Sequence, residues 1–322
     1  MNNPGHNNFV IVLLQSMLRP SSEQAVRISK LFRYFNIAAI GMLLFITALT
    51  IYICFRFSKK SNQQIPKQTK GNNKLEALMI IIPALLLAFF FYQTVSVMHA
   101  VDPEPDHYPQ ADVIITGHQF WWEINYPSAK FTTANELHLP VGKKILLELR
   151  SADVIHDWWV PALGNKMDLV PGRVNHLWVT IQKPETLAGL CSEFCGAQHA
   201  WMRMDVIASN TTDYQQWLNE NARVAKSPAD SLSLRGAGVF QVNSCAGCHN
   251  INGTEAMGRT GPDLTHLFSR KKMLGGLLPV SEGDVYQWLK NPQRIKPGSK
   301  MPNFIFSQDT IKALAHYLAQ LK

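Results

Sequence analysis

Cysteine is scarce in this sequence of 322 residues, and its distribution excludes a disulfide-stabilised scaffold. The five cysteines lie at positions 54, 191, 195, 245 and 248. Small disulfide-rich scaffolds spread their cysteines along the chain, whereas close pairs accompanied by histidine are typical of metal or haem sites. Two such pairs occur here, Cys191 with Cys195 and Cys245 with Cys248, while Cys54 lies alone in an apolar run.

Charged residues are also few, at 17 % of the chain against 46 % hydrophobic residues, which excludes a disordered chain. Residues 35–55 and 77–98 contain no charge at all, in runs of 21 and 22 residues. A helix of 21 residues is about 31 Å long and matches a hydrocarbon core of roughly 30 Å. Pro83 lies in the second run, where a membrane helix tolerates it. We therefore predict a transmembrane hairpin rather than two buried helices of a soluble protein.

Acidic residues are absent from residues 56–75, which make up nearly all of the segment between the two apolar runs. The connecting segment is basic throughout, with Arg56, Lys59, Lys60, Lys67, Lys70 and Lys74. The positive-inside rule places this loop in the cytoplasm and both termini outside, although basic residues also precede the first run. Much of the net charge of +8 lies in this loop, so we expect membrane lipid and no nucleic acid as partner. The apolar segment 9–14 is too short to span a membrane. It is either the remnant of a signal sequence, whose cleavage would remove about residues 1–20, or a segment that lies at the membrane surface.

From about residue 101 the pattern changes to short apolar alternations. These lie at residues 113–115, 120–124, 145–149 and 176–181, and no long helical pattern precedes Tyr214. The spacing predicts an antiparallel sandwich or barrel of about 110 residues, and residues 212–222 then predict a helix. The final unit opens with a glycine-rich helix start at 236–240 and ends in an amphipathic stretch over 310–321.

The predicted organisation has five parts. They are an N-terminal segment (1–33), the transmembrane hairpin (34–98), a β domain (99–220), a linker (221–233) and a C-terminal domain (234–322).

Soft metal ligands are concentrated in residues 191–202. The candidates are Cys191, Cys195, His199 and Met202, with His156 upstream. A single-copper electron-transfer site uses one Cys, two His and an axial Met. A second Cys four residues away lets two thiolates bridge two copper ions, each with one His, while Met202 and a carbonyl such as that of Glu193 complete the contacts. A disulfide would leave His199 and Met202 without a role, zinc seldom binds Met, and two structural thiols are the third alternative.

The sequence around these ligands resembles subunit II of the haem-copper cytochrome c oxidases. The shared residues are Gly117-His118-Gln119, residues 150–156, Gly164, Lys166, Asp168, Pro171, Gly172 and residues 191–202. The resemblance implies a cupredoxin-like Greek-key sandwich with a CuA centre. It implies as ligands His156, Cys191, the Glu193 carbonyl, Cys195, His199 and Met202. It also implies a magnesium or manganese ion shared with subunit I through the Glu193 carboxylate.

Two departures from the family pattern lie close to the copper ligands. Phe120 stands where the family has the tryptophan that receives electrons, and Trp121 and Trp122 follow it. Either Phe120 or Trp121 then takes that place, and Trp121 is the candidate electron relay, although bulky aromatics on a strand are most often core residues. Arg203 replaces a proline common in mitochondrial members, with no consequence for the metal.

The second cysteine pair forms a haem-attachment sequence. In Cys245-Ala246-Gly247-Cys248-His249 the two thiols add to the haem vinyl groups and His249 binds the iron. Met301 is the candidate sixth ligand, with Met257 and Met273 as alternatives. A zinc knuckle would need two more ligands, and only His266 is near. The resemblance to class I cytochromes c implies an all-α domain in which the Pro262 carbonyl accepts the Nδ1 proton of His249.

Glu76 lies at the cytoplasmic start of the second apolar run, seven residues before Pro83. A charge at a helix end usually reaches back to the interface, but carboxylates at membrane depth often mark proton paths. The position matches the family's glutamate at the mouth of a proton pathway into subunit I.

Together these features predict a bacterial subunit II with a fused cytochrome c. Electrons would pass from an external donor, a cytochrome c or a quinol-oxidising complex, to haem c, to CuA and to subunit I, where dioxygen is reduced and protons are moved. The resemblance also implies subunit III as a partner, and the inner membrane with both metal domains outside. The alternatives are a nitric oxide reductase with a similar copper domain and a membrane-tethered electron shuttle.

Overall fold

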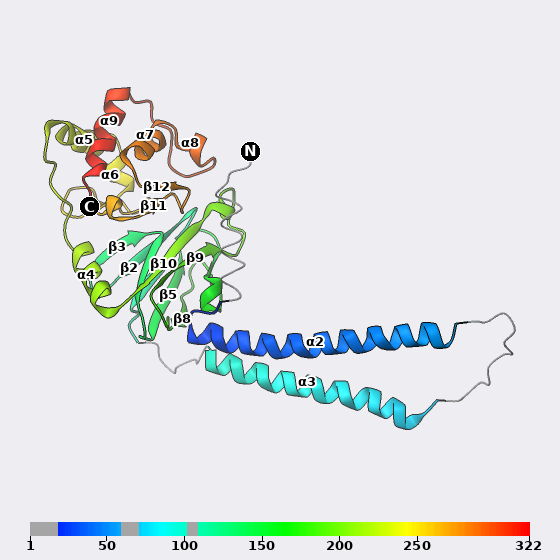
Figure 1. Cartoon of the computed structure of the whole chain (residues 1–322). Coiled ribbons are helices and arrows are strands. Elements are labelled where there is room, and N and C mark those ends of the chain that lie inside the picture. Colours follow the sequence, from blue (N-terminus) through cyan, green and yellow to red (C-terminus); the bar gives the residue numbers. More distant parts are fainter. Residues whose placement is uncertain (1–18, 59–70, 102–108) are drawn as a thin grey trace. The chain divides into compact units, whose positions relative to one another are not determined.

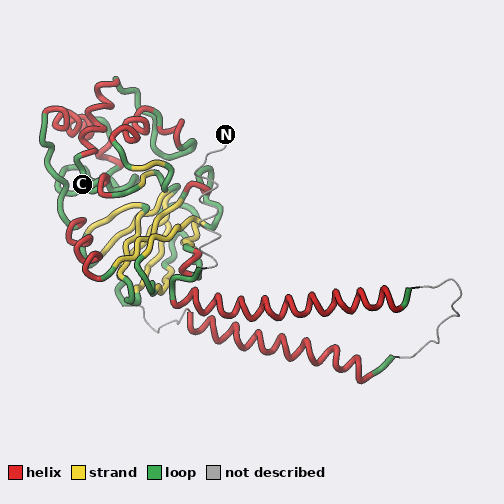
Figure 2. Tube along the Cα trace, in the orientation of Figure 1, coloured by secondary structure: helices red, strands yellow, loops and turns green. Residues whose placement is uncertain are grey.

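The computed structural model describes residues 19–58, 71–101 and 109–322. These residues form a helical hairpin, a β-sandwich and a C-terminal helical domain (Figures 1 and 2). The hairpin is one compact unit, and the sandwich and the C-terminal domain together form another. The predicted fold class, a membrane hairpin with a cupredoxin-like sandwich and a cytochrome c domain, is confirmed.

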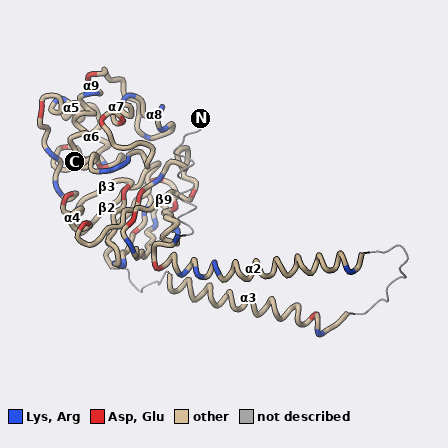
Figure 3. Tube along the Cα trace, viewed as in Figure 1, with Lys and Arg blue, Asp and Glu red and all other residues tan. Residues whose placement is uncertain are grey.

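The hairpin consists of α2 (Glu23–Arg56) and α3 (Asn73–Val101), which contain the two uncharged runs. Both helices are long and apolar enough to cross a membrane, and their most apolar windows are not buried within the protein. Phe35 and Phe90 meet edge to face with ring centroids 5.7 Å apart. Lysine and arginine mark the ends of α2 and leave its middle bare (Figure 3). Four of the six predicted loop cations, Lys59, Lys60, Lys67 and Lys70, lie outside the described residues.

The sandwich consists of two five-stranded sheets. One has the order β3-β2-β1-β5-β8, with β1 (Val113–His118), β2 (Trp121–Tyr126), β3 (Phe131–Ala134), β5 (Ile145–Ser151) and β8 (Asn175–Val179). The other has the order β4-β10-β9-β6-β7, with β4 (Glu136–Pro140), β10 (Arg203–Ser209), β9 (Glu185–Cys191), β6 (His156–Trp159) and β7 (Met167–Leu169). The helix α4 (Thr211–Asn221) follows β10.

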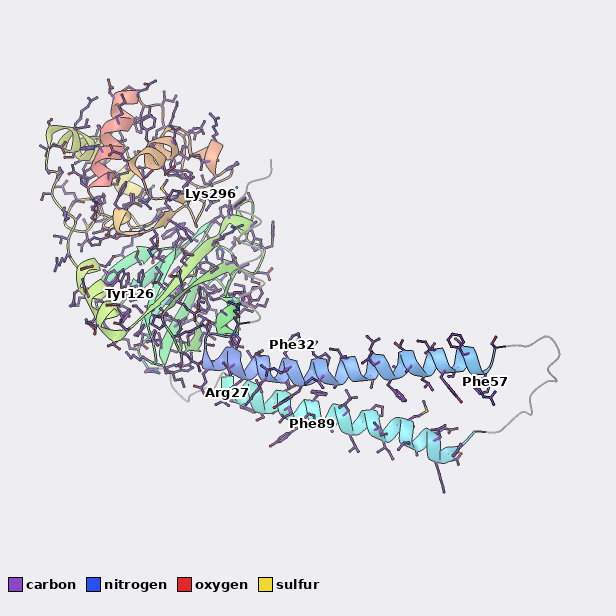
Figure 4. The ribbon with its side chains drawn as sticks, viewed as in Figure 1. Arg27, Phe32, Phe57, Phe89, Tyr126 and Lys296 are labelled. Carbon is purple, nitrogen blue, oxygen red and sulfur yellow. The ribbon has the colours of Figure 1, made fainter. Side chains whose placement is uncertain are left out.

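The prediction of a purely antiparallel arrangement is wrong for two strand pairs. β1 runs parallel to β5, and β10 runs parallel to β4. Apolar alternation identifies a strand and its buried face, but the direction of its neighbour depends on how the chain crosses between the sheets. Alternating side chains from both sheets fill the core, which includes the fully buried Trp122, Tyr126 and Trp158. The Tyr126 hydroxyl, labelled in Figure 4, donates to the His138 carbonyl at 3.0 Å.

The C-terminal domain packs its helices around a second core. Its helices are α5 (Ser231–Val242), α6 (Cys245–Cys248), α7 (Glu282–Lys290), α8 (Pro292–Ile295) and α9 (Gln308–Ala319). Asp230 caps α5 by accepting from the Ser233 amide, so this helix begins within the predicted linker. The amphipathic helix α9 buries Ile311, Leu314 and Leu318. A two-stranded hairpin, β11 (Lys272–Met273) with β12 (Leu278–Pro279), is the one addition to the predicted all-α domain among its described residues.

His316 joins the starts of two helices in this domain. Its ring lies 3.1 Å from the Asp230 carboxylate and 3.2 Å from that of Glu282. The hydrogen bond to Asp230 and the nearby Glu282 raise the pKa of His316. Because the folded-state pKa is raised, this contribution is complete below the unfolded pKa of about 6.5 and is lost as the pH rises through the folded value.

We expect the substitution His316→Gln to lower the melting temperature of the C-terminal domain slightly at pH 6 and to have less effect at pH 8.5. The effect is small because the group is largely solvated. Melting of the full chain, followed by visible absorbance at both pH values, measures it. A penalty that grew with pH would contradict this account.

Candidate metal and haem centres

The candidate copper ligands lie at the ends of adjacent strands. Cys191 ends β9, directly opposite Trp158 of β6, and His156 begins β6. The loop from β9 to β10 carries the other candidates and closes on itself, because the Cys191 amide donates to the Met202 carbonyl at 3.0 Å. Sheet pairing therefore brings His156 beside a loop that lies 35 residues away in sequence.

The two thiols lie at the centre of the cluster. Their Sγ atoms are 3.8 Å apart, and both cysteines are free and almost fully buried. Nδ1 of His156 lies 3.9 Å from the Cys191 sulfur, and Nδ1 of His199 lies 3.7 Å from the Cys195 sulfur. The Met202 sulfur is 3.8 Å from Cys195, and the Glu193 carbonyl oxygen is 3.2 Å from Cys191. Each thiol thus has one imidazole and one weaker donor beside it.

Asp153 fixes the orientation of His156. Its carboxylate accepts the Nε2 proton of His156 at 2.8 Å. The unprotonated nitrogen of the ring is then Nδ1, and its lone pair faces Cys191. The same carboxylate accepts from the Gln119 and Val154 amides, each at 2.7 Å. Gly117 allows the close approach of β1, because a Cβ atom there would lie 2.7 Å from the His156 ring.

The pair of thiols ionises unevenly without a metal. The hydrogen bond between them lowers the pKa of Cys191 and raises that of Cys195, because a second negative charge 3.8 Å away is strongly disfavoured. His156 and nearby backbone groups also stabilise the Cys191 thiolate. Positive ions between the two sulfurs would allow both to be thiolates, which is the form that binds metal.

The donor set fits copper better than zinc. The fold brings together two thiols, two imidazoles, a thioether and a carbonyl. The ligand atoms of Cys191, Cys195 and His156 lie within 4.8 Å of one another, close enough to bind one metal ion. Soft sulfur ligands with imidazole suit copper, and a structural zinc site uses four Cys or His ligands without Met. The residues therefore fit a binuclear copper centre.

The haem-attachment sequence forms a single short helix, α6, whose His249 amide donates to the Cys245 carbonyl at 2.9 Å. Nδ1 of His249 donates to the Pro262 carbonyl at 2.7 Å, as predicted, so Nε2 is free for iron. Burial lowers the pKa of His249 and favours the neutral ring that binds a metal. Gly261 leaves room for the ring, since a Cβ atom there would lie 2.5 Å from it. These residues fit a covalently bound haem.

Met301 packs, partly buried, against the same core as Cys245. The Gln293 amide nitrogen holds its segment by donating to the Met301 and Ser299 carbonyls, each at 2.9 Å. Of the alternative ligands, Met257 is 75 % exposed and Met273 is buried in β11.

We expect Met301→Leu to lower the haem reduction potential, because the Met/His pair raises it. The shift should be a fraction of the roughly 0.8 V that axial ligands span. Redox titration measures it, and Met257→Leu is the matched control. If the control shifts the potential and Met301→Leu does not, the sixth ligand is misassigned.

The side chains of the other predicted site residues have varied surroundings. Trp121 is nearly buried and stacks on His118 with ring centroids 4.3 Å apart, and Phe120 is also buried. The Glu193 side chain is exposed, and Glu76 is exposed in the first turn of α3. His266 lies 3.0 Å from the Arg223 carbonyl and so has a structural partner.

Several supporting residues carried no signal of their own in the sequence. The Gln119 side chain donates to the Cys195 carbonyl at 2.6 Å, and Trp122 Nε1 donates to the Met202 carbonyl at 3.4 Å. The Asp153 carboxylate accepts from the His156 ring, and the Gln293 side chain donates to the Met301 carbonyl. Gln119 and Asp153 belong to segments that the family resemblance marked, but the resemblance gave neither of them a role.

Three family profiles match successive parts of the chain. The transmembrane domain of cytochrome c oxidase subunit II matches residues 12–94, its periplasmic domain matches residues 128–209, and cytochrome c matches residues 233–322.

Cytochrome c oxidase subunit 2 of Alkalihalophilus pseudofirmus is 36 % identical over 269 residues, covering 82 % of this chain and 78 % of that protein. The subunit 2 of Bacillus sp. strain PS3 is 31 % identical over 287 residues, covering 83 % and 80 %. The crystal structure of the periplasmic domain of subunit II (CoxB) of Bradyrhizobium japonicum is 32 % identical, with a TM-score of 0.34, and covers 36 % of this chain and 96 % of that one. The chain belongs to the cytochrome c oxidase subunit II family and carries a C-terminal cytochrome c domain.

Proposed function

We propose that the chain is the electron-transfer subunit of a respiratory cytochrome c oxidase in a bacterial inner membrane. Electrons enter at a covalent haem c, pass to a binuclear CuA centre and continue to subunit I, where dioxygen is reduced. The single observation that carries the proposal is the convergence of two thiols, two imidazoles and a thioether in a chain that also holds a haem-attachment helix. The external donor is a cytochrome c or a quinol-oxidising complex.

The chain's own residues hold both redox groups in fixed surroundings. Copper supplies a one-electron couple shared between two ions, and the haem iron supplies another. Cys191 and Cys195 would hold the two copper ions through their thiolates, with His156, His199, Met202 and the Glu193 carbonyl as the remaining ligands. Asp153 keeps the His156 ring in one tautomer, and the Pro262 carbonyl does the same for His249. Fixed ligands limit the rearrangement that each change of redox state requires.

Subunit I would cover the exposed side of the copper loop, and subunit III would belong to the same complex. Phe194, next to the candidate ligand Glu193, is 76 % exposed, and its ring meets His199 edge to face with centroids 5.8 Å apart. A large exposed aromatic beside a redox centre favours a protein partner at this place. The exposed Glu193 carboxylate is then available for a magnesium or manganese ion shared with subunit I.

The hairpin would anchor the chain with the loop between α2 and α3 in the cytoplasm and the haem and copper domains outside. Glu76 lies in the first turn of α3, on the cytoplasmic side in this orientation. A carboxylate there supports a role at the mouth of a proton pathway into subunit I. Proton translocation by the complex is part of the proposal.

Dioxygen uptake by the complex that copurifies with this chain tests the function. Uptake driven by reduced cytochrome c and inhibited by cyanide is the expected result. Nitric oxide consumption without dioxygen uptake would keep both metal centres and change the substrate. A chain that migrates alone on a native gel after mild solubilisation would indicate a tethered electron shuttle instead.

A further inference from the structure

Lys296 is a lysine whose side chain is almost fully buried, in the segment that leads to Met301. Only 5 % of the residue is exposed. The ammonium group of Lys296, a residue labelled in Figure 4, donates to the Phe120 carbonyl at 3.0 Å and reaches the Trp201 and Leu274 carbonyls at 3.4 Å each. Phe120 and Trp201 belong to the sandwich, and Leu274 belongs to the cytochrome c domain. The buried cation therefore binds acceptors from both domains.

Burial of a cation without a carboxylate is costly, and the surrounding carbonyls offset this cost only while the two domains are in contact. Desolvation lowers the pKa of Lys296 to about 8, so the amine stays mostly protonated at pH 7. If the domains separated, the ammonium would regain water and the carbonyls of Phe120 and Trp201 would lose their donor. The arrangement links the position of one domain to that of the other.

Four further contacts join the sandwich and the cytochrome c domain. The Gln198 side chain donates to the Pro297 carbonyl. The Glu136 carboxylate of β4 accepts from the Lys271 amide at 2.9 Å, and Lys272 pairs with Asp205 of β10 at 2.8 Å. Gly275 lies so close to the copper loop that a Cβ atom there would be 2.6 Å from the Trp201 carbonyl oxygen. The sandwich and the cytochrome c domain therefore match each other in charge and in shape where they meet.

Two of the contacts, Lys296 with Trp201 and Gln198 with Pro297, join the two segments that carry redox ligands. Gln198 and Trp201 flank His199 and precede Met202, and Lys296 and Pro297 precede Met301. We propose that Lys296 is a positioning residue that fixes the cytochrome c domain on the copper-ligand loop. One electron then leaves the ferrous haem, which becomes ferric, and reduces the copper centre within a fixed contact rather than after repeated encounters of a tethered domain. This role rests on the proposed function.

Lysine labelling in the solubilised complex tests the contact without any reference to activity. An amine-reactive acylating reagent at pH 7, followed by mass spectrometry, should modify Lys296 at least tenfold more slowly than the exposed Lys312 of α9 once each rate is divided by the fraction of free amine at that site. Equal rates would overturn the proposal. Since the cytochrome c domain alone could shield part of the side chain, a variant provides the second measurement.

Lys296→Met removes the cation and keeps the length of the side chain, and Lys312→Met is the matched control with the same change of charge. In Lys296→Met, hydrogen exchange of the Lys271 amide should speed up, because its acceptor Glu136 lies across the same surface. Haem-to-copper electron transfer, followed by flash photolysis, should slow at least tenfold while both reduction potentials and both absorption spectra stay unchanged. The control should match the unmodified protein in all four measurements.

Unchanged exchange together with an unchanged transfer rate in Lys296→Met would refute the positioning role. A shifted potential would also refute it, because the residue would then act on driving force rather than on position. If the unmodified complex bound haem but no copper, the proposed function would fail, while the labelling and exchange results would still decide whether the contact exists.

Discussion

Cys195→Ser is expected to abolish the binuclear copper spectrum and to stop electron flow from the haem to subunit I, while the haem stays attached. Cys195 contacts three other candidate ligands through its sulfur, namely Cys191, His199 and Met202. Serine oxygen is a poor bridge between soft metal ions. Changes to residues that only support a metal ligand typically cost about 10–100-fold in affinity or activity, so the loss of a bridging ligand should exceed this range.

Copper content, the visible and electron paramagnetic resonance spectra, and turnover with reduced cytochrome c measure this effect. Cys54→Ser is the matched control, because Cys54 is exposed on α2 and is remote in sequence from both clusters. The control should keep two copper ions and full turnover. A Cys195→Ser protein that retained both ions with an unchanged spectrum would show that the assigned bridge is wrong.

Replacement of both Cys245 and Cys248 by alanine is expected to remove covalent haem completely and to leave the copper spectrum intact. In the proposed haem centre the two thioether bonds would form at α6, whereas the candidate copper ligands belong to a separate β-sandwich core. Turnover with a donor that reduces haem should fall to background, because the first acceptor is absent. Turnover with a small reductant that reaches copper directly should persist.

Haem staining of the denatured chain on a gel is the decisive measurement for this pair, since only covalently bound haem survives denaturation. Cys54→Ala again serves as the control and should stain fully. If the double variant folded but lost its copper signal as well, the two centres would not be independent and the division into modules would be wrong.

Local patterns in the sequence predicted most of the fold. Uncharged runs located α2 and α3, and apolar alternation located β1, β5 and β8. Such patterns depend on neighbours within a few residues, so one chain is enough to find them. The parallel pairing of β1 with β5 was not predictable, because it depends on the route of the chain between two sheets.

The candidate sites likewise contain residues that local sequence indicates and residues that only the fold reveals. The copper loop and the haem-attachment sequence are compact in sequence, so residue type and spacing alone indicated their ligands. Asp153, Gln293 and Lys296 were missed, because each acts through a contact with a backbone or side-chain group that folding brings close. An Asp or Lys in a loop is ordinarily a solvated surface residue, and only burial and partners distinguish these from that common case.

The short distance between Cys191 and Cys195 also bears on how the chain matures. With free sulfurs 3.8 Å apart, the pair has to close by about 1.8 Å to reach the length of a disulfide bond. In the orientation proposed above, the sandwich faces the oxidising side of the membrane, where neighbouring thiols are prone to form a disulfide before any metal binds. If the pair is the proposed copper site, we expect that copper can be loaded only while both thiols are reduced.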